Sequence, residues 1–271
     1  TGVQRAQELV DSEGVDILFG AASSAVTLAL KEFVAEREEV VLFNGMSANR
    51  KITAAPCTDY LFRYTHHAEQ QAAAMAPWTY ENLGKSMYFV YADYAWGQSE
   101  LKYNKKIFEE QGGTVTGSVG IPVGTTDMSS QISQIDRDVD VIGLAVTAGM
   151  AVNFFNQAYE YGLHEDHEMI SADGGFTGIF DTNPKARVGV KTLTQYPQRP
   201  IGAYDNEHNR QFQSQYKEEY GHNPYLQSGL GYARTEAFEK AAKQADFTSK
   251  DDTDALISEL ESLKLSREES V

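Results

Sequence analysis

The sequence predicts an α/β protein made of two Rossmann-like lobes with parallel sheets, and three observations point to it. Predicted helices and strands alternate along almost the whole chain. The strands are nearly continuous apolar runs, which is typical of parallel strands covered by helices on both faces. Two short segments, residues 62–65 and 194–197, each follow a completed run of helices and strands and precede a change in the pattern.

A chain that leaves one lobe, builds a second and returns accounts for these two segments. It gives residues 1–65 and 198–271 as a discontinuous lobe 1, residues 66–197 as lobe 2, and a ligand cleft between them. The alternative is that both segments are ordinary loops between a strand and a helix.

The individual elements follow from the period of the apolar residues. Helical spacing predicts a first helix over residues 3–10, and a β-rich run closed by Gly20 predicts a strand over 15–20. The same patterns then predict, in order, helix 23–34, strand 40–43, helix 68–80, strand 86–91, helix 100–111, strand 114–119, helix 128–135, strand 139–144, helix 150–161 and strand 168–171. After a last strand over 188–193 the chain is mostly helical, with helices over 207–220, 227–243 and 252–263.

Both ends of this predicted fold look incomplete. The chain opens on a helix, so its first strand would join a parallel sheet without a preceding strand and helix. We therefore expect that the first βαβ elements, about 30 residues or more, are lacking. The polar C-terminal end, residues 266–271, likewise stops without a strand.

The composition of the 271 residues is that of a folded globular protein, with 41% hydrophobic and 23% charged residues. Lys and Arg number 23 against 39 Asp and Glu, and the resulting net charge of −16 repels nucleic-acid phosphates and anionic lipid. We expect no nucleic-acid partner and no direct membrane insertion, and partners that are small or cationic.

Cys57 is the single cysteine, which excludes an internal disulfide. The N-terminal residues lack the basic and then apolar order of a signal peptide. If the protein is exported, its signal peptide has been removed.

Motifs for catalysis are incomplete. The segment 84–86 resembles the end of a phosphate-binding loop, but Thr79 stands where the first glycine belongs. Residues 229–231 begin a dinucleotide fingerprint without its third glycine. The cluster at 164–168 has ligand-type side chains, yet it lies in a predicted loop, where a solvated acidic surface is the commoner role. The sequence therefore predicts no enzyme, no catalytic residue, no metal and no cofactor.

Small and polar residues follow several predicted strands instead. In an open parallel sheet the ligand crevice lies at these carboxyl ends, because loops and helix N-termini present unpaired N–H groups there. Ser23 and Ser24 follow the first strand, and their hydroxyls either cap the next helix or bind a carboxylate. The loop 44–49 follows the second strand, and its small residues allow a ligand to approach the backbone closely.

The second predicted lobe has its own candidates in the same position. Tyr94 and Trp96 follow the strand that ends at Tyr91, and their flat rings either stack on a ligand or pack beneath a helix. Thr147 follows another strand. Asp173 follows a third, beside the glycines at 174 and 175, and either binds a ligand cation or caps a turn.

This arrangement resembles the type I periplasmic binding proteins of the branched-chain amino acid, amide and urea class, which are solute receptors of ABC importers. The resemblance rests on the order and spacing of residues 15–24, 40–48, 93–97 and 171–174, with 218–224 in the expected late position. The chains of that family start earlier, with a strand, a helix and a strand, and end later, with a third crossing.

The resemblance also implies roles for individual residues. The carboxylate-binding groups would be the hydroxyls of Ser23 and Ser24 and the backbone of Met46, Ser47 and Ala48. The aromatic wall would be Trp96 with Tyr94, and the ammonium-binding acid would be Asp173. Two positions depart from the family pattern. Ala48 replaces a frequent hydroxyl residue, and Thr147 or Ala148 stands at a position that is often aromatic in amino-acid receptors.

The function implied by the resemblance is that of a non-enzymatic, extracytoplasmic receptor. It would close around an amino acid of the branched-chain type or a small amide and deliver it to the permease subunits of an ABC transporter. Asp173 favours an amino acid, since a neutral amide or urea needs no paired charge. The alternative is a ligand-sensing regulatory domain of the same fold, which a fused output domain would reveal.

Overall fold

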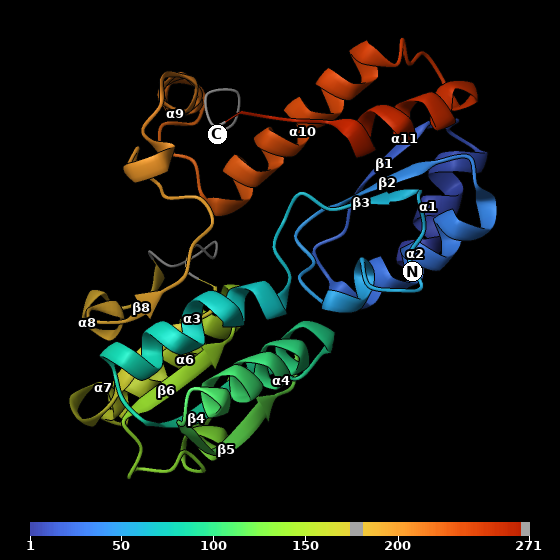
Figure 1. The fold of residues 1–271 in the computed structure, drawn as a ribbon. Coiled ribbons are helices and arrows are strands. Elements are labelled where there is room, and N and C mark those ends of the chain that lie inside the picture. Colours follow the sequence, from blue (N-terminus) through green and yellow to red (C-terminus); the bar gives the residue numbers. More distant parts are fainter. Residues whose placement is uncertain (174–180, 267–271) are drawn as a thin grey trace. The chain divides into compact units, whose positions relative to one another are not determined.

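The computed structural model describes residues 1–173 and 181–266, and the chain divides into two compact units. Unit 1 comprises residues 1–66 together with the segment from 195 onward, and unit 2 comprises residues 67–194. Each unit contains one parallel sheet with helices packed against it (Figure 1). The predicted α/β class with parallel sheets is confirmed.

Unit 1 has a three-stranded sheet in the order β1–β2–β3. Its strands are β1 (Ile17–Gly20), β2 (Val41–Asn44) and β3 (Leu61–Phe62). Its helices are α1 (Gly2–Asp11), α2 (Ser24–Arg37), α9 (Glu207–Tyr220), α10 (Leu226–Gln244) and α11 (Thr253–Ser262), with short 3-10 turns at Arg50–Ile52, Gly202–Tyr204 and Lys250–Asp252.

Alternate side chains of β2 belong to opposite faces of this sheet. Leu42 lies in an apolar cluster with residues of α1 and α2, whereas Val41 and Phe43 pack with residues of α10 and α11. Figure 1 shows α1 and α2 on one side of the three strands and α10 and α11 on the other. Because both faces are covered, β2 is buried along its whole length, as the apolar run in the sequence predicts.

Unit 2 has a five-stranded sheet in the order β5–β4–β6–β7–β8. Its strands are β4 (Ser86–Ala92), β5 (Thr114–Ile121), β6 (Val141–Ala145), β7 (Glu168–Ser171) and β8 (Lys191–Thr192). Its helices are α3 (Ala68–Asn82), α4 (Ala95–Glu110), α5 (Ser129–Ile132), α6 (Ala148–Glu160), α7 (Leu163–Asp166) and α8 (Pro184–Arg187).

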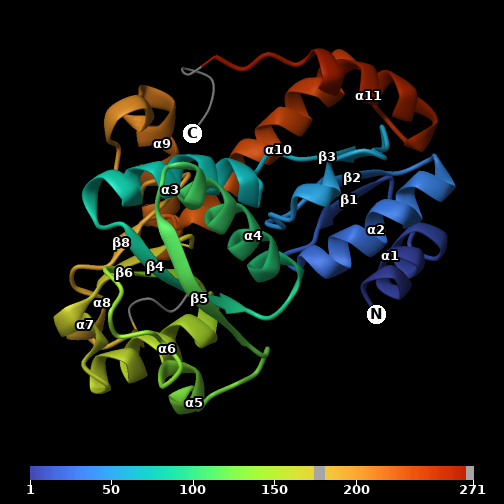
Figure 2. The ribbon, with the colours of Figure 1, turned by 60° about the horizontal axis from the view of Figure 1, so that its bottom comes forward.

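The main core of unit 2 lies between the sheet and α6. Tyr88 and Val90 of β4 point to this side, where they meet Phe154 and Phe155. Figure 2 shows α5 and α6 on this face and α3 and α4 on the other. The strands of both sheets run parallel, so within each unit their carboxyl ends lie along one edge.

Several elements differ from the sequence prediction, and among them the predicted helix over 128–135 shortens to the four residues of α5. β3 was not predicted, because a strand of two residues shows no period, and it overlaps the predicted crossing segment 62–65 only at Phe62. α4 begins at Ala95 rather than at residue 100, so Trp96 is helical and does not lie in a loop. The predicted loop over 164–168 contains the short helix α7. The predicted strand over 188–193 shortens to the two residues of β8.

Candidate functional site

The predicted serines of unit 1 lie together at the carboxyl ends of β1 and β2, but they differ in what they bind. Ser23 is the N-cap residue of α2, is partly exposed, and its hydroxyl makes no capping hydrogen bond. Ser24 is fully buried, and its Oγ accepts the Asn49 N–H at 3.2 Å. Ser47 is 1% exposed; its Oγ donates to the Ala21 carbonyl at 2.8 Å and lies 2.7 Å from the Thr27 hydroxyl. Of the three serines, only Ser23 therefore has a hydroxyl group that is available for a hydrogen bond to a ligand.

The backbone of the loop after β2 adds two further donors. The Met46 N–H is engaged, since it donates to the Ala21 carbonyl at 3.2 Å. Within residues 1–173 and 181–266, the N–H groups of Ser47 and Ala48 have no acceptor. The Met46 side chain packs against the aromatic cluster around Tyr196. The predicted use of Ser47 and Ala48 through their backbone therefore has the donors it needs, whereas the Met46 amide is committed.

Two arginines that the sequence analysis did not identify hold this loop. Arg234 of α10 donates from Nη1 to the carbonyls of Asn44 and Gly45, at 3.0 and 3.1 Å. Arg63 donates from Nη2 to the Asn49 carbonyl at 2.7 Å. Burial lowers the pKa of Arg63 to about 10, which still leaves it charged at neutral pH. Burial also lowers the pKa of Arg234, but a guanidinium in a protein keeps its proton. They place positive charge beside the loop while its amides stay available.

No local signal marks these arginines, because Arg234 stands in an ordinary helical pattern and Arg63 in a segment without period. Lys31 of α2 supports the next part of the loop in a similar way. Its Nζ donates to the carbonyls of Lys51 and Ala54, at 3.1 and 3.2 Å, and to that of Pro56.

In unit 2 the aromatic pair lies where β4 meets α4. Tyr94 is the N-cap residue of α4, and Trp96 lies in the first turn. Their ring centroids are 5.9 Å apart with a tilt of 43°. Trp96 is only 8% exposed. Burial, with the nearby charges of Asp173 and Glu100, raises the pKa of Tyr94 to about 12, so the phenol is neutral at physiological pH and can donate a hydrogen bond.

Asp173 and Thr147 are brought together at the carboxyl ends of β7 and β6. The Thr147 hydroxyl donates to the Asp173 carboxylate, and the Asp173 N–H donates to Ser171 Oγ at 3.3 Å. Asp173 is half-buried. Ala148 begins α6 with a left-handed backbone, φ 50°, and is exposed. The glycines at 174 and 175, named with Asp173 in the predicted motif, lie outside the described residues.

Glu100 is a further acid of this site that the sequence analysis did not identify. It lies in α4, one turn after Trp96, and is fully buried. Its Oε2 atom accepts a hydrogen bond from Asn104 Nδ2 at 3.2 Å, whereas Oε1 has no partner among the described residues. Burial raises the pKa of Glu100 well above its ordinary value, and the charge of Asp173 acts in the same direction. An acid in the middle of a helix gives no hint in the sequence that tertiary packing buries it.

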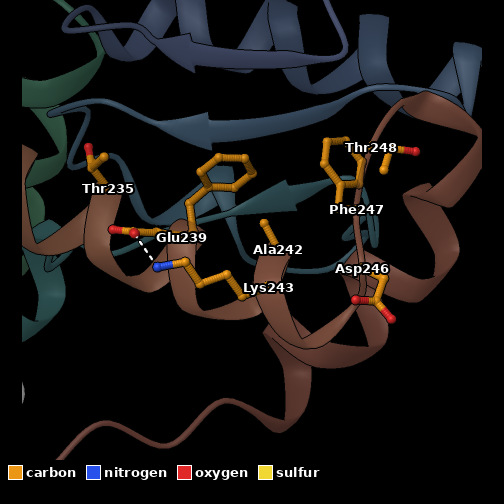
Figure 3. A pocket seen from close by; sticks show the side chains of 8 residues that line it. Thr235, Glu239, Ala242, Lys243, Asp246, Phe247 and Thr248 are labelled. Carbon is orange, nitrogen blue, oxygen red and sulfur yellow. Dashed lines mark hydrogen bonds and ion pairs between the residues drawn. The ribbon is translucent and has the colours of Figure 1, made fainter.

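Figure 3 shows a hollow in unit 1 that contains none of the predicted site residues. It has a volume of about 630 Å³ and is lined by the C-terminal half of α10 and the segment that follows. Phe238, Ala242 and Phe247 form its apolar wall, and the ion pair between Glu239 and Lys243 lies at its rim.

Two kinds of site are absent from the part of the chain that the structure describes. No three His, Cys, Asp or Glu side chains gather there in a way that could hold a metal ion. None of the described helices has the length and apolar character needed to cross a bilayer.

A comparison with protein families defines the class to which this fold belongs. Residues 1–268 match a family described as periplasmic binding protein, so the chain belongs to this family. Its members are transport binding proteins rather than enzymes, in agreement with the incomplete catalytic motifs.

Individual relatives are distant. The chain is 27% identical over 186 residues, 64% of its length and 44% of the relative, to a protein of Brucella abortus named Leu/Ile/Val-binding protein homolog 8. The chain spans about half the length of the curated relatives it matches.

Two solved structures have the same fold. A leucine-binding protein of Thermotoga maritima superposes with a TM-score of 0.83 at 25% identity, over 96% of this chain and 72% of that one. A solute-binding protein of an ABC transporter from Rhodopseudomonas palustris, in complex with 3,4-dihydroxybenzoic acid, superposes with a TM-score of 0.84 at 23% identity, over 95% of this chain and 69% of that one.

Proposed function

We propose that this chain is the ligand-binding region of an extracytoplasmic solute receptor of an ABC importer, and that its ligand is an amino acid of the branched-chain type. The observation that carries the proposal is the family match over residues 1–268. Permease subunits are the partners that a receptor of this class serves.

The charges of the two units support a zwitterionic ligand. Unit 1 offers donors to a carboxylate, namely the Ser23 hydroxyl and the N–H groups of Ser47 and Ala48, beside the charges of Arg63 and Arg234. Unit 2 offers the Asp173 carboxylate, which suits an ammonium group. An α-amino acid carries both a carboxylate and an ammonium group.

Two other solute classes match these groups less well. An aromatic acid, such as the 3,4-dihydroxybenzoic acid bound by the relative from Rhodopseudomonas palustris, has a carboxylate but no cation for Asp173. A small amide has neither charge, and burying Asp173 against it would leave the acid without a counter-charge.

Hinge closure follows if one ligand contacts both units. A ligand shifts a protein toward the conformation in which it makes more contacts, so engagement of Ser23 and Ser47 with the carboxylate, and of Asp173 with the ammonium group, would favour a closed state. Trp96 and Tyr94 would then supply the wall for the apolar side chain.

The proposal is tested by isothermal calorimetry with L-leucine, L-valine, acetamide, urea, benzoate and 3,4-dihydroxybenzoate. We expect L-leucine or L-valine to bind, and Asp173→Ala to weaken that binding at least about tenfold, because the ligand loses its counter-charge. Asp138→Ala, at an exposed acid of the same unit, is the matched control and should leave the affinity unchanged. Binding of benzoate alone, or an unchanged affinity in Asp173→Ala, would contradict the proposed ligand class.

A further inference from the structure

We propose that Thr27 of α2 is a positioning residue for the carboxylate site, because its buried hydroxyl connects the two loops that carry the carboxylate donors. These loops are residues 20–23, at the end of β1, and residues 44–49, at the end of β2. The inference rests on the proposed function, which assigns Ser23 and two N–H groups of the second loop to the ligand carboxylate. Thr27 is 0% exposed, so it acts on the ligand only through other residues.

The first argument is the position of the Thr27 side chain. It lies on the buried face of α2, where a hydroxyl group needs a hydrogen-bond partner. The usual partner of a helical threonine is the carbonyl four residues earlier, and the Ser23 carbonyl lies 3.3 Å from Thr27 Oγ1. The Ala21 carbonyl lies at 3.5 Å, whereas Ser47 Oγ lies at only 2.7 Å. The shortest of these contacts is therefore to the loop after β2 and not to α2 itself.

The second argument is that the number of protons assigns a direction to each hydrogen bond. The Ala21 carbonyl oxygen carries no proton, so its 2.8 Å contact with Ser47 Oγ uses the single proton of the Ser47 hydroxyl. The 2.7 Å contact between Ser47 and Thr27 then uses the proton of the Thr27 hydroxyl. Thr27 Oγ1 in turn accepts the Ala21 N–H at 3.3 Å.

These three bonds form a closed hydroxyl ring, which runs from the Ala21 N–H through Thr27 and Ser47 to the Ala21 carbonyl. Each hydroxyl donates once and accepts once, and hydrogen bonds in such a chain strengthen one another. The Met46 N–H donates to the same Ala21 carbonyl at 3.2 Å, beside the ring. Ala21 belongs to the first loop and Ser47 to the second, so Thr27 is the member through which α2 fixes their separation.

The ring bears on the ligand because the proposed carboxylate donors lie on both sides of it. Ser23 follows Ala21 by two residues, and its hydroxyl makes no capping bond. The Ser47 N–H belongs to the same residue as the ring hydroxyl, and the Ala48 N–H follows it. A carboxylate that accepts from both loops needs a fixed separation between them, and a preorganised site loses less affinity to the ordering of its groups.

The ring is tested first without ligand, by amide hydrogen exchange in the full chain. Thr27→Val nearly keeps the shape of the side chain but removes the hydroxyl, so the Ala21 N–H should exchange at least about tenfold faster. The Leu42 N–H, which donates to the Tyr60 carbonyl at 2.8 Å, is the reference for general stability. Thr27→Ser retains the hydroxyl and should leave the Ala21 rate within about threefold of the parent. Equal acceleration at Ala21 and Leu42, or equal effects of the two variants, would overturn the ring.

The role in binding is tested by calorimetry with L-leucine in a double-mutant cycle. We expect Thr27→Val to weaken binding at least about fivefold in the parent chain but less than about twofold in the Ser47→Ala background, where the ring is already broken. Thr27→Ser should restore the parent affinity. If Thr27→Val binds L-leucine within about twofold of the parent, the ring serves the fold alone and the positioning role is wrong.

Two further results keep the inference testable. If Thr27→Val does not fold, nuclear magnetic resonance of the unmodified chain decides, because the hydroxyl protons of Thr27 and Ser47 should exchange with water at least about a hundredfold more slowly than that of Ser23. Fast exchange of both protons would overturn the ring. If the unmodified chain binds no L-leucine, the proposed ligand fails, while the amide exchange of Ala21 still decides whether Thr27 connects the two loops.

Discussion

At the scale of single residues, the hydroxyl groups after β1 and β2 divide into structural and available ones. Ser47→Ala removes two buried hydrogen bonds, to Ala21 and Thr27, and we expect it to lower the free energy of unfolding by about 1–3 kcal/mol. Ser23→Ala removes no bond, because the Ser23 hydroxyl does not cap α2, and should change it by less than about 0.5 kcal/mol. Urea denaturation of both variants measures the difference. Equal losses would mean that Ser23 is also structural.

Glu100 should make stability depend on pH. Because burial raises its pKa in the folded state, the folded protein keeps a proton that the unfolded chain releases above about pH 4.5. The folded state then binds more protons than the unfolded one, so this residue makes the protein less stable as pH rises from there. We expect the unfolding constant of the unmodified protein, relative to Glu100→Gln, to increase by up to about tenfold per pH unit above pH 5. A ratio that stays constant from pH 5 to pH 8 would show that Glu100 is ionised in the fold.

At the scale of elements, the junction of β4 and α4 depends on one glycine. A Cβ atom at Gly97 would lie 2.0 Å from the Ala92 carbonyl oxygen, and a backbone atom of a central strand cannot give way. We expect Gly97→Ala to lower the free energy of unfolding by at least about 2 kcal/mol. Gly231→Ala in α10 is the matched control, since no atom lies within 4 Å of its Cβ, and it should raise that free energy by up to about 1 kcal/mol. Calorimetric unfolding of both variants checks the opposite signs.

The elements that the sequence predicted best are those with a long period and defined ends. Helix α9 matches its predicted range, with Asn206 as its N-cap and Gly221 at its end, and β7 matches its predicted bounds, with Met169 and Ile170 buried. The two-residue β3 is too short to show a period, and its pairing with β2 depends on tertiary structure that no local pattern in the sequence indicates.

The candidate site was predictable only in part, for a similar reason. Position after a strand identified Ser23, Thr147 and Asp173. The contacts of Arg234 and the burial of Glu100 depend on tertiary packing, and no local pattern in the sequence encodes them.

At the scale of the whole molecule, the net charge of −16 is spread evenly. Residues 67–194 contain 8 Lys and Arg against 16 Asp and Glu, a charge of −8, and the rest of the chain carries the other −8. Most ion pairs of the described residues lie at the surface, where each adds little to stability. Repulsion among the excess acids should therefore outweigh them.

Screening that repulsion should stabilise the fold. We expect sodium chloride to raise the melting temperature by several degrees between about 0.02 and 0.5 M, with most of the rise below about 0.15 M, where the Debye length has already fallen to about 8 Å. Differential scanning calorimetry measures this, with tetramethylammonium chloride at equal ionic strength to separate screening from sodium binding. A melting temperature that falls with salt would mean that local ion pairs such as Arg37 with Asp11 and Glu39 outweigh the repulsion of the excess charge.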